Sequence, residues 1–338
     1  MFYYNRYLCK KFIDMAKVLG IGNALVDIMT RLDHDEHLER FKLPKGSMTL
    51  ADEILVEEVT RATLHLEKIQ SSGGSAANTI NGLAKLGVET AFMGKVGKDE
   101  VGDFFHEDLV KNKINPILYF SDNPSGQAIA LVSPDSERTF ATYLGAAVEL
   151  AADDLKAEDF QGYDYFHIEG YLVQNHALIE MALKLAKENG LKVSLDLASY
   201  NVVESNLEFL KKVVREYVDI LFANEEEARA YTGKTPGEAL HEMGDQVEIA
   251  IVKTGNKGSM IKKGDDRIAV DIIPVKALDT TGAGDLYASG FLYGLSMEFP
   301  LDKCGKIGAI LGGNVIEVMG AKMDDIRWER IRSKIAAL

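Results

Sequence analysis

The sequence predicts an α/β fold with a mostly parallel central sheet, helices on both faces of that sheet, and a small β-sheet lid. In the second half, the short apolar runs at 163–170, 191–198, 218–224 and 248–255 alternate with helical patterns. Such alternation is typical of βαβ units in a buried parallel sheet. The stretch at 126–145 instead resembles a hairpin turning at Pro-Asp, which does not belong to the βαβ series.

Composition indicates an ordinary soluble chain. Its 338 residues carry a formal net charge of −14, and a protein that binds nucleic acid in general needs a basic surface instead. The two cysteines, Cys9 and Cys304, stand at unrelated positions, so neither a disulfide framework nor a zinc site is indicated. No run of 18 apolar residues predicts a membrane span. We therefore expect a reducing, cytoplasmic setting, with no nucleic-acid or membrane partner.

The expected domain covers residues 15–338. Residues 1–14 are interrupted by charged side chains and lack the apolar core of a signal peptide, so we interpret them as an extra N-terminal tail. Segments near 28–60 and 115–145 fall outside the βαβ series, and we expect them to form the lid.

Four polar residues follow or end the apolar strands of the second half. They are Glu169, Asp196, Asn224 and Thr254. Because the carboxyl ends of parallel strands meet at one edge of the sheet, these side chains are expected to lie near each other, where such folds bind ligands.

The stretch DTTGAGD precedes an apolar helical pattern and ends at Asp285. Either Thr280 or Thr281 is expected to cap the helix, and Gly282 and Gly284 allow backbone amides to approach a ligand closely. Amides at a helix N-terminus form an anion site. The alternative is a capped core helix with a Gly-rich entry, which leaves the carboxylate beside an anion site unexplained.

Four motifs occur in order: GGSAANTINGLAKLG, GKVGKDEVGD, NEEE and DTTGAGD. Together they resemble the ribokinase-like (PfkB) family of carbohydrate and nucleoside kinases, over residues from about 17 to the C-terminus. The resemblance implies a three-layer α/β/α domain with a β-sheet lid. It also implies an ATP-dependent kinase in which Asp285 is the catalytic base and the amides of Gly282, Ala283 and Gly284 form an anion hole.

The resemblance places the nucleotide and Mg²⁺ at the later motifs. Asn224 and Glu227 would hold Mg²⁺ through water, and an N-cap with a capping box is the compatible structural alternative. Thr254, Gly255 and Gly258, in the stretch KTGNKGS, would lie on the ATP side.

For the acceptor, the resemblance implies contacts from Asp27, Gly73, Gly74 and Asn78. Two acceptors and an amide suit a vicinal diol such as that of ribose. The alternative for Asp27 is a loop-capping carboxylate.

Some members of the family bind a monovalent cation, and Asp279 and Thr281 match that site, which implies K⁺ activation. The loop at 318–323 falls where further ligands would come. Asn314, on an otherwise apolar helix face, either faces adenine or bonds within the core. Arg138 in the hairpin could meet an anion, but we interpret it as a solvated strand residue.

The acceptor is expected to be a sugar or a nucleoside. The stretch GNALVDI and Ser75 in GGSAANT resemble the adenosine-kinase-like branch, and Phe140, Tyr143 and Tyr171 are candidates for an apolar wall against a base. A sugar or phosphosugar kinase is the alternative within the family. An inactive nucleotide- or sugar-binding regulator is the alternative outside enzymes, and Asp285 argues against it. A dehydrogenase is disfavoured because Leu25 replaces the third glycine of its fingerprint. The family resemblance leaves a monomer or a lid-mediated homodimer open.

Overall fold

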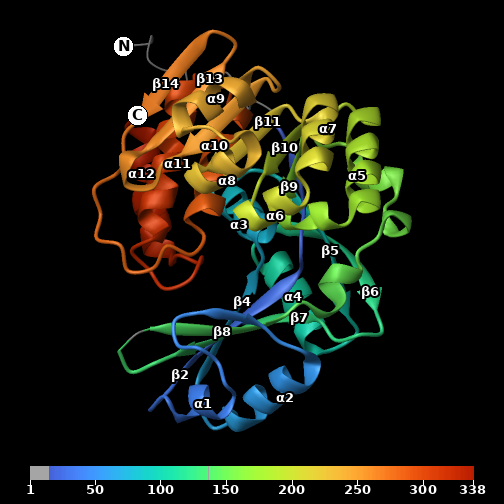
Figure 1. Ribbon diagram of the computed structural model, residues 1–338, viewed down its shortest axis with the longest axis vertical. Helices are drawn as coiled ribbons and strands as arrows, with labels where there is room; N and C mark the ends of the chain where they lie inside the picture. Colours follow the sequence, from blue (N-terminus) through green and yellow to red (C-terminus); the bar gives the residue numbers. More distant parts are fainter. Residues whose placement is uncertain (1–14, 136) are drawn as a thin grey trace, which may run out of the picture.

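The computed structural model describes residues 15–135 and 137–338, and these build two sheets (Figure 1). The expected tail at 1–14 lies outside the described residues. In the large sheet the strand order is β14-β13-β12-β11-β10-β9-β1-β5-β6. Its neighbours are parallel except at one edge, where β13 is antiparallel to both β12 and β14. In the small sheet the order is β3-β8-β7-β2-β4.

The large sheet consists of β1 (Val18–Ile21), β5 (Thr90–Gly97), β6 (Ile114–Ser121), β9 (Tyr165–Glu169), β10 (Lys192–Asp196), β11 (Ile220–Asn224), β12 (Ile249–Lys253), β13 (Ser259–Lys263) and β14 (Asp266–Val270). The small sheet consists of β2 (Leu25–Arg31), β3 (Met48–Leu50), β4 (Lys68–Gly73), β7 (Gly126–Val132) and β8 (Arg138–Tyr143). The helices are α1 (Glu36–Arg40), α2 (Glu53–Ala62), α3 (Ser75–Lys85), α4 (Glu100–Lys111), α5 (His176–Glu188), α6 (Tyr200–Ser205), α7 (Leu207–Tyr217), α8 (Glu225–Thr232), α9 (Pro236–Gly244), α10 (Ala283–Ser296), α11 (Leu301–Val315) and α12 (Asp325–Ala336).

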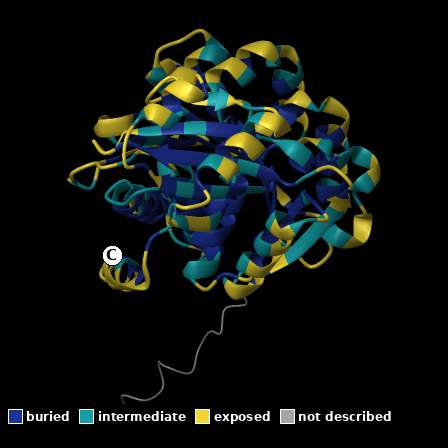
Figure 2. Cartoon of the chain, turned by 90° about the horizontal axis from the view of Figure 1, so that it is seen from below, coloured by how far each residue is buried: buried dark blue, intermediate teal, exposed yellow. Residues whose placement is uncertain are grey.

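Both faces of the large sheet are covered, which explains its near-continuous apolar strands. Ile220 and Phe222 of β11 pack into the core on the side of α3, α4 and α10. Leu221 and Ala223 of the same strand pack into the core on the side of α5, α7 and α9. Figure 2 shows the buried strands enclosed by helices with exposed outer faces. The three α/β/α layers follow from this alternation.

Helices α10 and α11 lie unusually close together, because small residues face each other between them. A Cβ built on Gly290 would lie 2.7 Å from the backbone oxygen of Ile307. Helix α3 approaches α10 in the same way, since a Cβ on Gly82 would lie 2.3 Å from Ser289 Oγ. This packing fixes the N-terminus of α10 beside the N-terminus of α3.

The predicted fold class is confirmed, as are the four predicted strands of the second half and the hairpin formed by β7 and β8. Two details of the expected lid differ. Strand β4 (Lys68–Gly73) lies outside both expected lid segments, yet it pairs with β2 in the small sheet. Strand β6, which we assigned to the lid segment at 115–145, pairs in parallel with β5 in the large sheet. The sequence alone does not distinguish an edge strand of a large sheet from a lid strand, because both are half-exposed.

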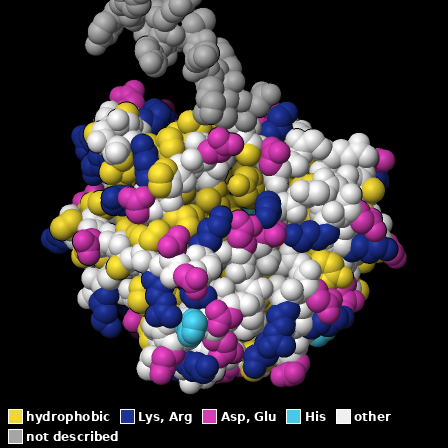
Figure 3. All heavy atoms as spheres, turned by 90° about the horizontal axis from the view of Figure 1, so that it is seen from above, with side chains coloured by type: hydrophobic (Ala, Val, Ile, Leu, Met, Phe, Trp, Pro, Cys, Tyr) yellow, Lys and Arg dark blue, Asp and Glu magenta, His cyan; other side chains and the backbone are white. Residues whose placement is uncertain are grey.

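In the described part of the chain, no helix has the length and apolar character needed to cross a membrane. On the face opposite the small sheet, acidic and basic side chains are interspersed (Figure 3). This mixed face agrees with the absence of a basic footprint in the composition.

We expect Gly290→Ala to lower the free energy of unfolding by about 1–3 kcal/mol, because the new methyl group meets the backbone of α11. The matched control is Gly237→Ala in α9, where a Cβ would meet nothing within 4 Å. That substitution should be neutral or stabilise by up to about 1 kcal/mol through helix propensity. Urea unfolding measures both variants. Equal effects of the two substitutions would contradict the close packing of α10 on α11.

Candidate active site

The carboxyl edge of the large sheet gathers the polar residues predicted to lie there. Glu169 and Asp196 are direct neighbours at the ends of β9 and β10, and Asn224 pairs with Lys253 across β11 and β12. Thr254 follows immediately after Lys253. The placement predicted from strand ends is confirmed for all four residues.

Asp285 lies in the first turn of α10, where α3 supplies its partners. Ser75 Oγ donates to Asp285 Oδ1 at 2.8 Å, and Asn78 Nδ2 donates to Asp285 Oδ2 at 3.0 Å. Burial raises the pKa of Asp285 to about 6, against the opposing effect of these two hydrogen bonds. The GGSAANT and DTTGAGD motifs therefore meet at one carboxylate.

The entry to α10 differs from the prediction that a threonine caps it. The N-cap residue is Gly282, with a left-handed φ of 74° and no side-chain cap. A Cβ at this position would lie 2.6 Å from the Cβ of Ala321, so both its φ and its surroundings require glycine. Thr281 Oγ1 donates instead to Asp279 Oδ1 at 2.8 Å. No side chain caps the first amides of α10, and the amide of Ala283 donates to the backbone oxygen of Thr280 at 3.2 Å. Amides at a helix N-terminus that lack a side-chain cap can bind an anion.

Lys253 is a buried cation beside this helix terminus, and no sequence pattern indicated a role for it. Its Nζ donates to Asp196 Oδ2 at 2.7 Å, and the two side chains are only 15% and 7% exposed. Burial acts to lower the pKa of Lys253, but the charges of Asp196, Glu227 and Asp285 outweigh it and the pKa is raised. A Cβ on Gly284 would lie 3.1 Å from Lys253 Nζ. Because Gly284 has no side chain, the ammonium of Lys253 can lie close to the start of α10.

Asn224 and Glu227 form the capping box that was considered as the structural alternative. Asn224 Oδ1 accepts from the amides of Glu226 and Glu227, and Glu227 Oε2 accepts from the amide of Asn224 at 2.7 Å. Burial, and then the charge of Asp196, raise the pKa of Glu227 to about 7. In the residues described, no three His, Cys, Asp or Glu side chains form a metal-ligand group. A metal held here through water is compatible with this arrangement.

The acceptor residues predicted near the N-terminus lie at the junction of β2, β4 and α3. A Cβ on Gly73 would lie 2.5 Å from the carboxylate of Asp27, and a Cβ on Gly74 would lie 2.2 Å from Asn23 O. Burial raises the pKa of Asp27 to about 6. Asn78 Oδ1 is buried with no partner among the described residues. Asp27 and Asn78 therefore offer oxygen acceptors to a ligand.

Cross-strand register determines which lid side chains share a face with Asp27. Met29 pairs with Ala130, and Ala130 pairs with Phe140, so Asp27, Met29 and Phe140 lie on one face of the small sheet. Tyr143, three residues after Phe140, points to the opposite face and packs into the core. Of our candidates for an apolar wall, Phe140 is on the correct face and Tyr143 is not.

Glu169 connects the loop between β1 and β2 to the start of α3. Its Oε1 accepts from the backbone amide of Asn23 at 3.0 Å and its Oε2 accepts from the amide of Ala76 at 3.0 Å. Burial raises the pKa of Glu169 to about 7. The sequence placed Glu169 at the sheet edge but gave no sign of this bridging role, because both partners are remote in the chain.

Arg138 is not a solvated strand residue as we had interpreted it. Its guanidinium forms an ion pair with Asp279 and donates to Thr281 Oγ1 at 2.7 Å. The side chains of Arg138 and Asp279 are 11% and 7% exposed. Asp279 Oδ2 also accepts from the amide of Gly320 at 2.6 Å. The oxygens expected to bind a monovalent cation are thus engaged by a guanidinium from the small sheet.

The remaining residues that were predicted to bind the nucleotide make ordinary structural contacts. Thr254 Oγ1 donates to Gly258 O at 2.9 Å and closes the turn that contains Gly255. Gly255 and Gly258 both have positive φ, 55° and 90°. Asn314 Nδ2 donates to Ile310 O at 2.7 Å, which is the core alternative considered for it. These contacts are also compatible with a nucleotide nearby.

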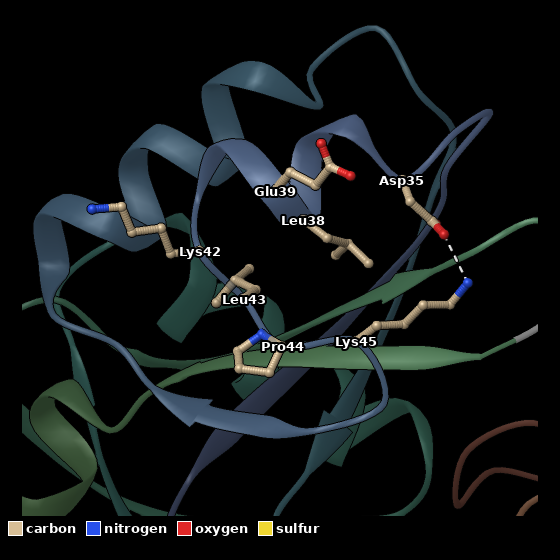
Figure 4. Close-up of a pocket in the computed structure, with 7 residues that line it drawn as sticks. All are labelled: Asp35, Leu38, Glu39, Lys42, Leu43, Pro44 and Lys45. Atoms are coloured by element: carbon tan, nitrogen blue, oxygen red, sulfur yellow. Dashed lines mark hydrogen bonds and ion pairs between the residues drawn. The ribbon is translucent and has the colours of Figure 1, made fainter.

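A hollow of about 360 Å³ lies elsewhere, around α1 (Figure 4). It is lined by Asp35, Leu38, Glu39, Lys42, Leu43, Pro44 and Lys45. None of these residues belongs to the site described above, so the hollow is separate from the candidate active site.

Comparisons with known proteins identify the family to which this chain belongs. The family model for pfkB family carbohydrate kinases matches residues 55–327. An uncharacterized sugar kinase of Archaeoglobus fulgidus is 31% identical over 245 residues, which are 71% of this chain and 96% of the relative. The nucleoside kinase of Methanocaldococcus jannaschii is 29% identical over 328 residues, 95% of this chain and 97% of the relative. The structure of adenosine kinase from Sinorhizobium meliloti has a TM-score of 0.82 at 31% identity, covering 95% and 99% of the two chains.

The ion pair between Lys253 and Asp196 yields a stability prediction. Lys253→Met and Asp196→Asn should each lower the free energy of unfolding by about 3–5 kcal/mol, because each leaves one buried charge or polar group without its partner. The double variant should lose clearly less than the sum of the two. Urea unfolding of the four proteins measures the coupling. Strictly additive losses would mean that the two side chains do not stabilise each other.

Proposed function

Because the chain belongs to the pfkB family of carbohydrate kinases and is a kinase of sugars or nucleosides, we propose that it transfers the γ-phosphoryl group of ATP to the hydroxymethyl group of an adenosine-like nucleoside. The observation that carries the proposal is the meeting of two distant motifs at Asp285, which lies beside the uncapped amides of α10.

In the proposed reaction, the carboxylate of Asp285 takes the proton of the acceptor hydroxyl. The hydroxyl oxygen forms a bond to the γ-phosphorus as the bond from that phosphorus to the bridging oxygen breaks, and ADP leaves with the bridging oxygen. Asp285 suits the role of base because burial raises its pKa to about 6, closer to neutral pH than an exposed carboxyl group. Ser75 and Asn78 fix its orientation.

The amides of Gly282, Ala283 and Gly284 are proposed to stabilise the charge on the transferring phosphoryl group. They stand at the positive end of the α10 dipole, and Lys253 adds an ammonium beside Gly284. Phosphoryl transfer needs mainly positioning and charge neutralisation, which this arrangement can supply. The proposed role of Asp285 as a base accounts for a carboxylate among these donors.

The nucleotide is proposed to lie along Asn224, Thr254, Gly255, Gly258 and Asn314. Mg²⁺ bound with the nucleotide would neutralise phosphate charge during transfer. Glu227 fits a water-mediated contact, because both of its carboxylate oxygens accept hydrogen bonds from Asn224 in the capping box. This chain would thus contribute hydrogen-bond acceptors to hydrated magnesium rather than direct ligands.

The acceptor is proposed to lie between Asp27, Gly73, Gly74 and Asn78. Asp27 and the unpartnered Asn78 Oδ1 accept hydrogen bonds from hydroxyl groups. The apolar side chains of Met29 and Phe140 share the face of Asp27 and would suit a nucleobase. These observations, and the nucleoside and adenosine kinases among the relatives, favour a nucleoside.

A sugar or phosphosugar acceptor is the alternative, and the sugar kinase among the relatives favours it. The two are separated by measuring ADP release with adenosine, other nucleosides, ribose, fructose and fructose phosphates. A catalytically inactive regulator would bind ATP without releasing ADP in the presence of any of these acceptors.

A monovalent cation at Asp279 and Thr281 does not fit alongside the guanidinium of Arg138. We propose that Arg138 takes the place of K⁺. A guanidinium can satisfy a carboxylate and a hydroxyl at once, and its charge is permanent. This replacement also links the small sheet to the loop that precedes α10.

Asp285→Asn is expected to lower kcat by roughly 10²- to 10⁴-fold, because the amide cannot accept the proton of the acceptor. Binding of ATP should be retained. The wild-type kcat/KM should fall as the pH drops through about 6, since protonated Asp285 is no base. The assay is steady-state ADP release with the best acceptor of the panel above.

Asp265→Asn is a matched charge-changing control, because Asp265 is exposed in the turn between β13 and β14, at the opposite end of the large sheet from the carboxyl edge. Turnover at the wild-type rate in Asp285→Asn would remove Asp285 from the role of base.

For the monovalent cation, we expect wild-type turnover to be equally fast in K⁺, Na⁺ and choline salts. Arg138→Met should be slower by roughly 10- to 100-fold, because the loop before α10 loses its anchor, and K⁺ should restore part of the rate. Activation of the wild-type protein by K⁺, with no cation effect in Arg138→Met, would contradict the replacement.

A further inference from the structure

Lys322 is placed against the candidate active site by its two predecessors in the chain. The amide of Gly320 donates to Asp279 Oδ2 at 2.6 Å. The next residue, Ala321, fills the space where Gly282 lacks a Cβ, at 2.6 Å. Segment 320–322 is therefore held on the loop that precedes α10, and the side chain of Lys322 begins within the site.

The ammonium of Lys322 is buried and has no hydrogen-bond acceptor in the described residues. The charges that face it come from four elements: Asp108 on α4, Asp27 on β2, Asp285 on α10 and Lys85 on α3. None of the three acids forms an ion pair with it, whereas Lys85 pairs at the surface with Asp325. Burial lowers the pKa of Lys322 to about 8, because these acids only partly compensate for the lost water.

An unpaired buried ammonium is costly, so its presence beside two carboxylates assigned to the reaction calls for a ligand. The charge of Lys322 is the strongest influence opposing burial on the pKa of Asp27, yet the two groups do not touch. A hydroxyl group both donates and accepts. One hydroxyl can therefore bridge a carboxylate and an ammonium that lie about 4.5–5.5 Å apart.

We propose that Lys322 determines acceptor specificity by donating a hydrogen bond to a ring hydroxyl whose own proton is donated to Asp27. The ligand class is an acceptor with a free hydroxyl at the carbon that faces Asp27, as in a ribose diol. The inference deepens the proposed function and rests on it for the position of the acceptor. The matching deoxy acceptor has no oxygen for Lys322 and should lose this contact.

A purely electrostatic role for Lys322 makes a different prediction. An ammonium that only moderates the charges of Asp27 and Asp285 would affect hydroxylated and deoxy acceptors equally. The ratio of kcat/KM for the two acceptors therefore separates hydrogen bonding from a general field effect.

The experiment compares wild type, Lys322→Met and Lys85→Met with matched acceptor pairs. The pairs are adenosine with 2′-deoxyadenosine and 3′-deoxyadenosine, and ribose with 2-deoxyribose. Lys85→Met removes a nearby positive charge outside the acceptor site and is the matched electrostatic control. Thermal unfolding verifies that each variant is folded.

In wild type and Lys85→Met, one deoxy acceptor should be used less well than its hydroxylated partner by roughly 10- to 100-fold. In Lys322→Met that preference should shrink several-fold through the loss of activity with the hydroxylated acceptor, and a smaller preference should remain because the hydroxyl still donates to Asp27. An unchanged preference in folded Lys322→Met would overturn the proposal, as would an equal loss with both acceptors.

A pH series supplies a second readout. The kcat/KM for the hydroxylated acceptor should fall as pH rises through about 8, because neutral Lys322 donates a weaker hydrogen bond. Lys322→Arg should restore the preference and abolish the fall, since a guanidinium stays charged. A fall at the same pH in Lys322→Arg would contradict the assignment.

Failure of the proposed function would look different. If nucleosides are inert while ribose is phosphorylated, the nucleoside proposal fails and the ribose pair still tests Lys322. If adenosine is phosphorylated but the deoxy preference does not depend on Lys322, only the further inference fails.

Discussion

The buried ammonium of Lys253 is the interaction on which the candidate site depends. Three acids from three different elements, Asp196, Glu227 and Asp285, all contribute to the raised pKa of Lys253. Without this cation, the carboxyl edge of the sheet would collect negative charge at the point where the proposed function places the ATP phosphates. Lys253 therefore permits the proposed carboxylate base and the proposed anion site to coexist within the first turn of one helix.

The second constraint is the connection between the two sheets. Arg138 lies on the small sheet and its partner Asp279 is 141 residues later in the chain. Asp279 in turn accepts the amide of Gly320, next to Lys322. A movement of the small sheet would therefore displace both the loop before α10 and the segment 320–322. Both the proposed anion hole and the proposed acceptor contacts are thereby tied to one carboxylate.

The sequence predicted the features that depend on neighbouring residues, such as strands and motifs. It did not predict contacts between residues that are remote in the chain. Periodicity located the strands, and the strand-end rule brought Glu169, Asp196, Asn224 and Thr254 to one edge. Motif resemblance identified the family and singled out Asp285. Arg138 was misinterpreted, because a lone charged residue in a hairpin is usually solvated and its partner is remote. Lys253 and Lys322 were missed although they lie in quoted stretches, since burial of a lysine depends on tertiary packing. The threonine cap failed because Gly282 has the left-handed backbone that ends the loop.

The acids of the site share one electrostatic property that bears on function. Burial raises the pKa of Asp27, Glu169, Glu227 and Asp285 above the values of exposed groups. An acid whose pKa is raised on folding stabilises the fold most below its unfolded pKa, and this contribution is lost as pH rises through the folded pKa. At neutral pH these carboxylates therefore oppose folding. Hydroxyl donors, or a cation with the nucleotide, would relieve that cost and so bind more tightly. For Asp27 and Asp285, the two acids assigned to the acceptor, part of the free energy lost to burial on folding would be regained when hydroxyl groups of a ligand bind.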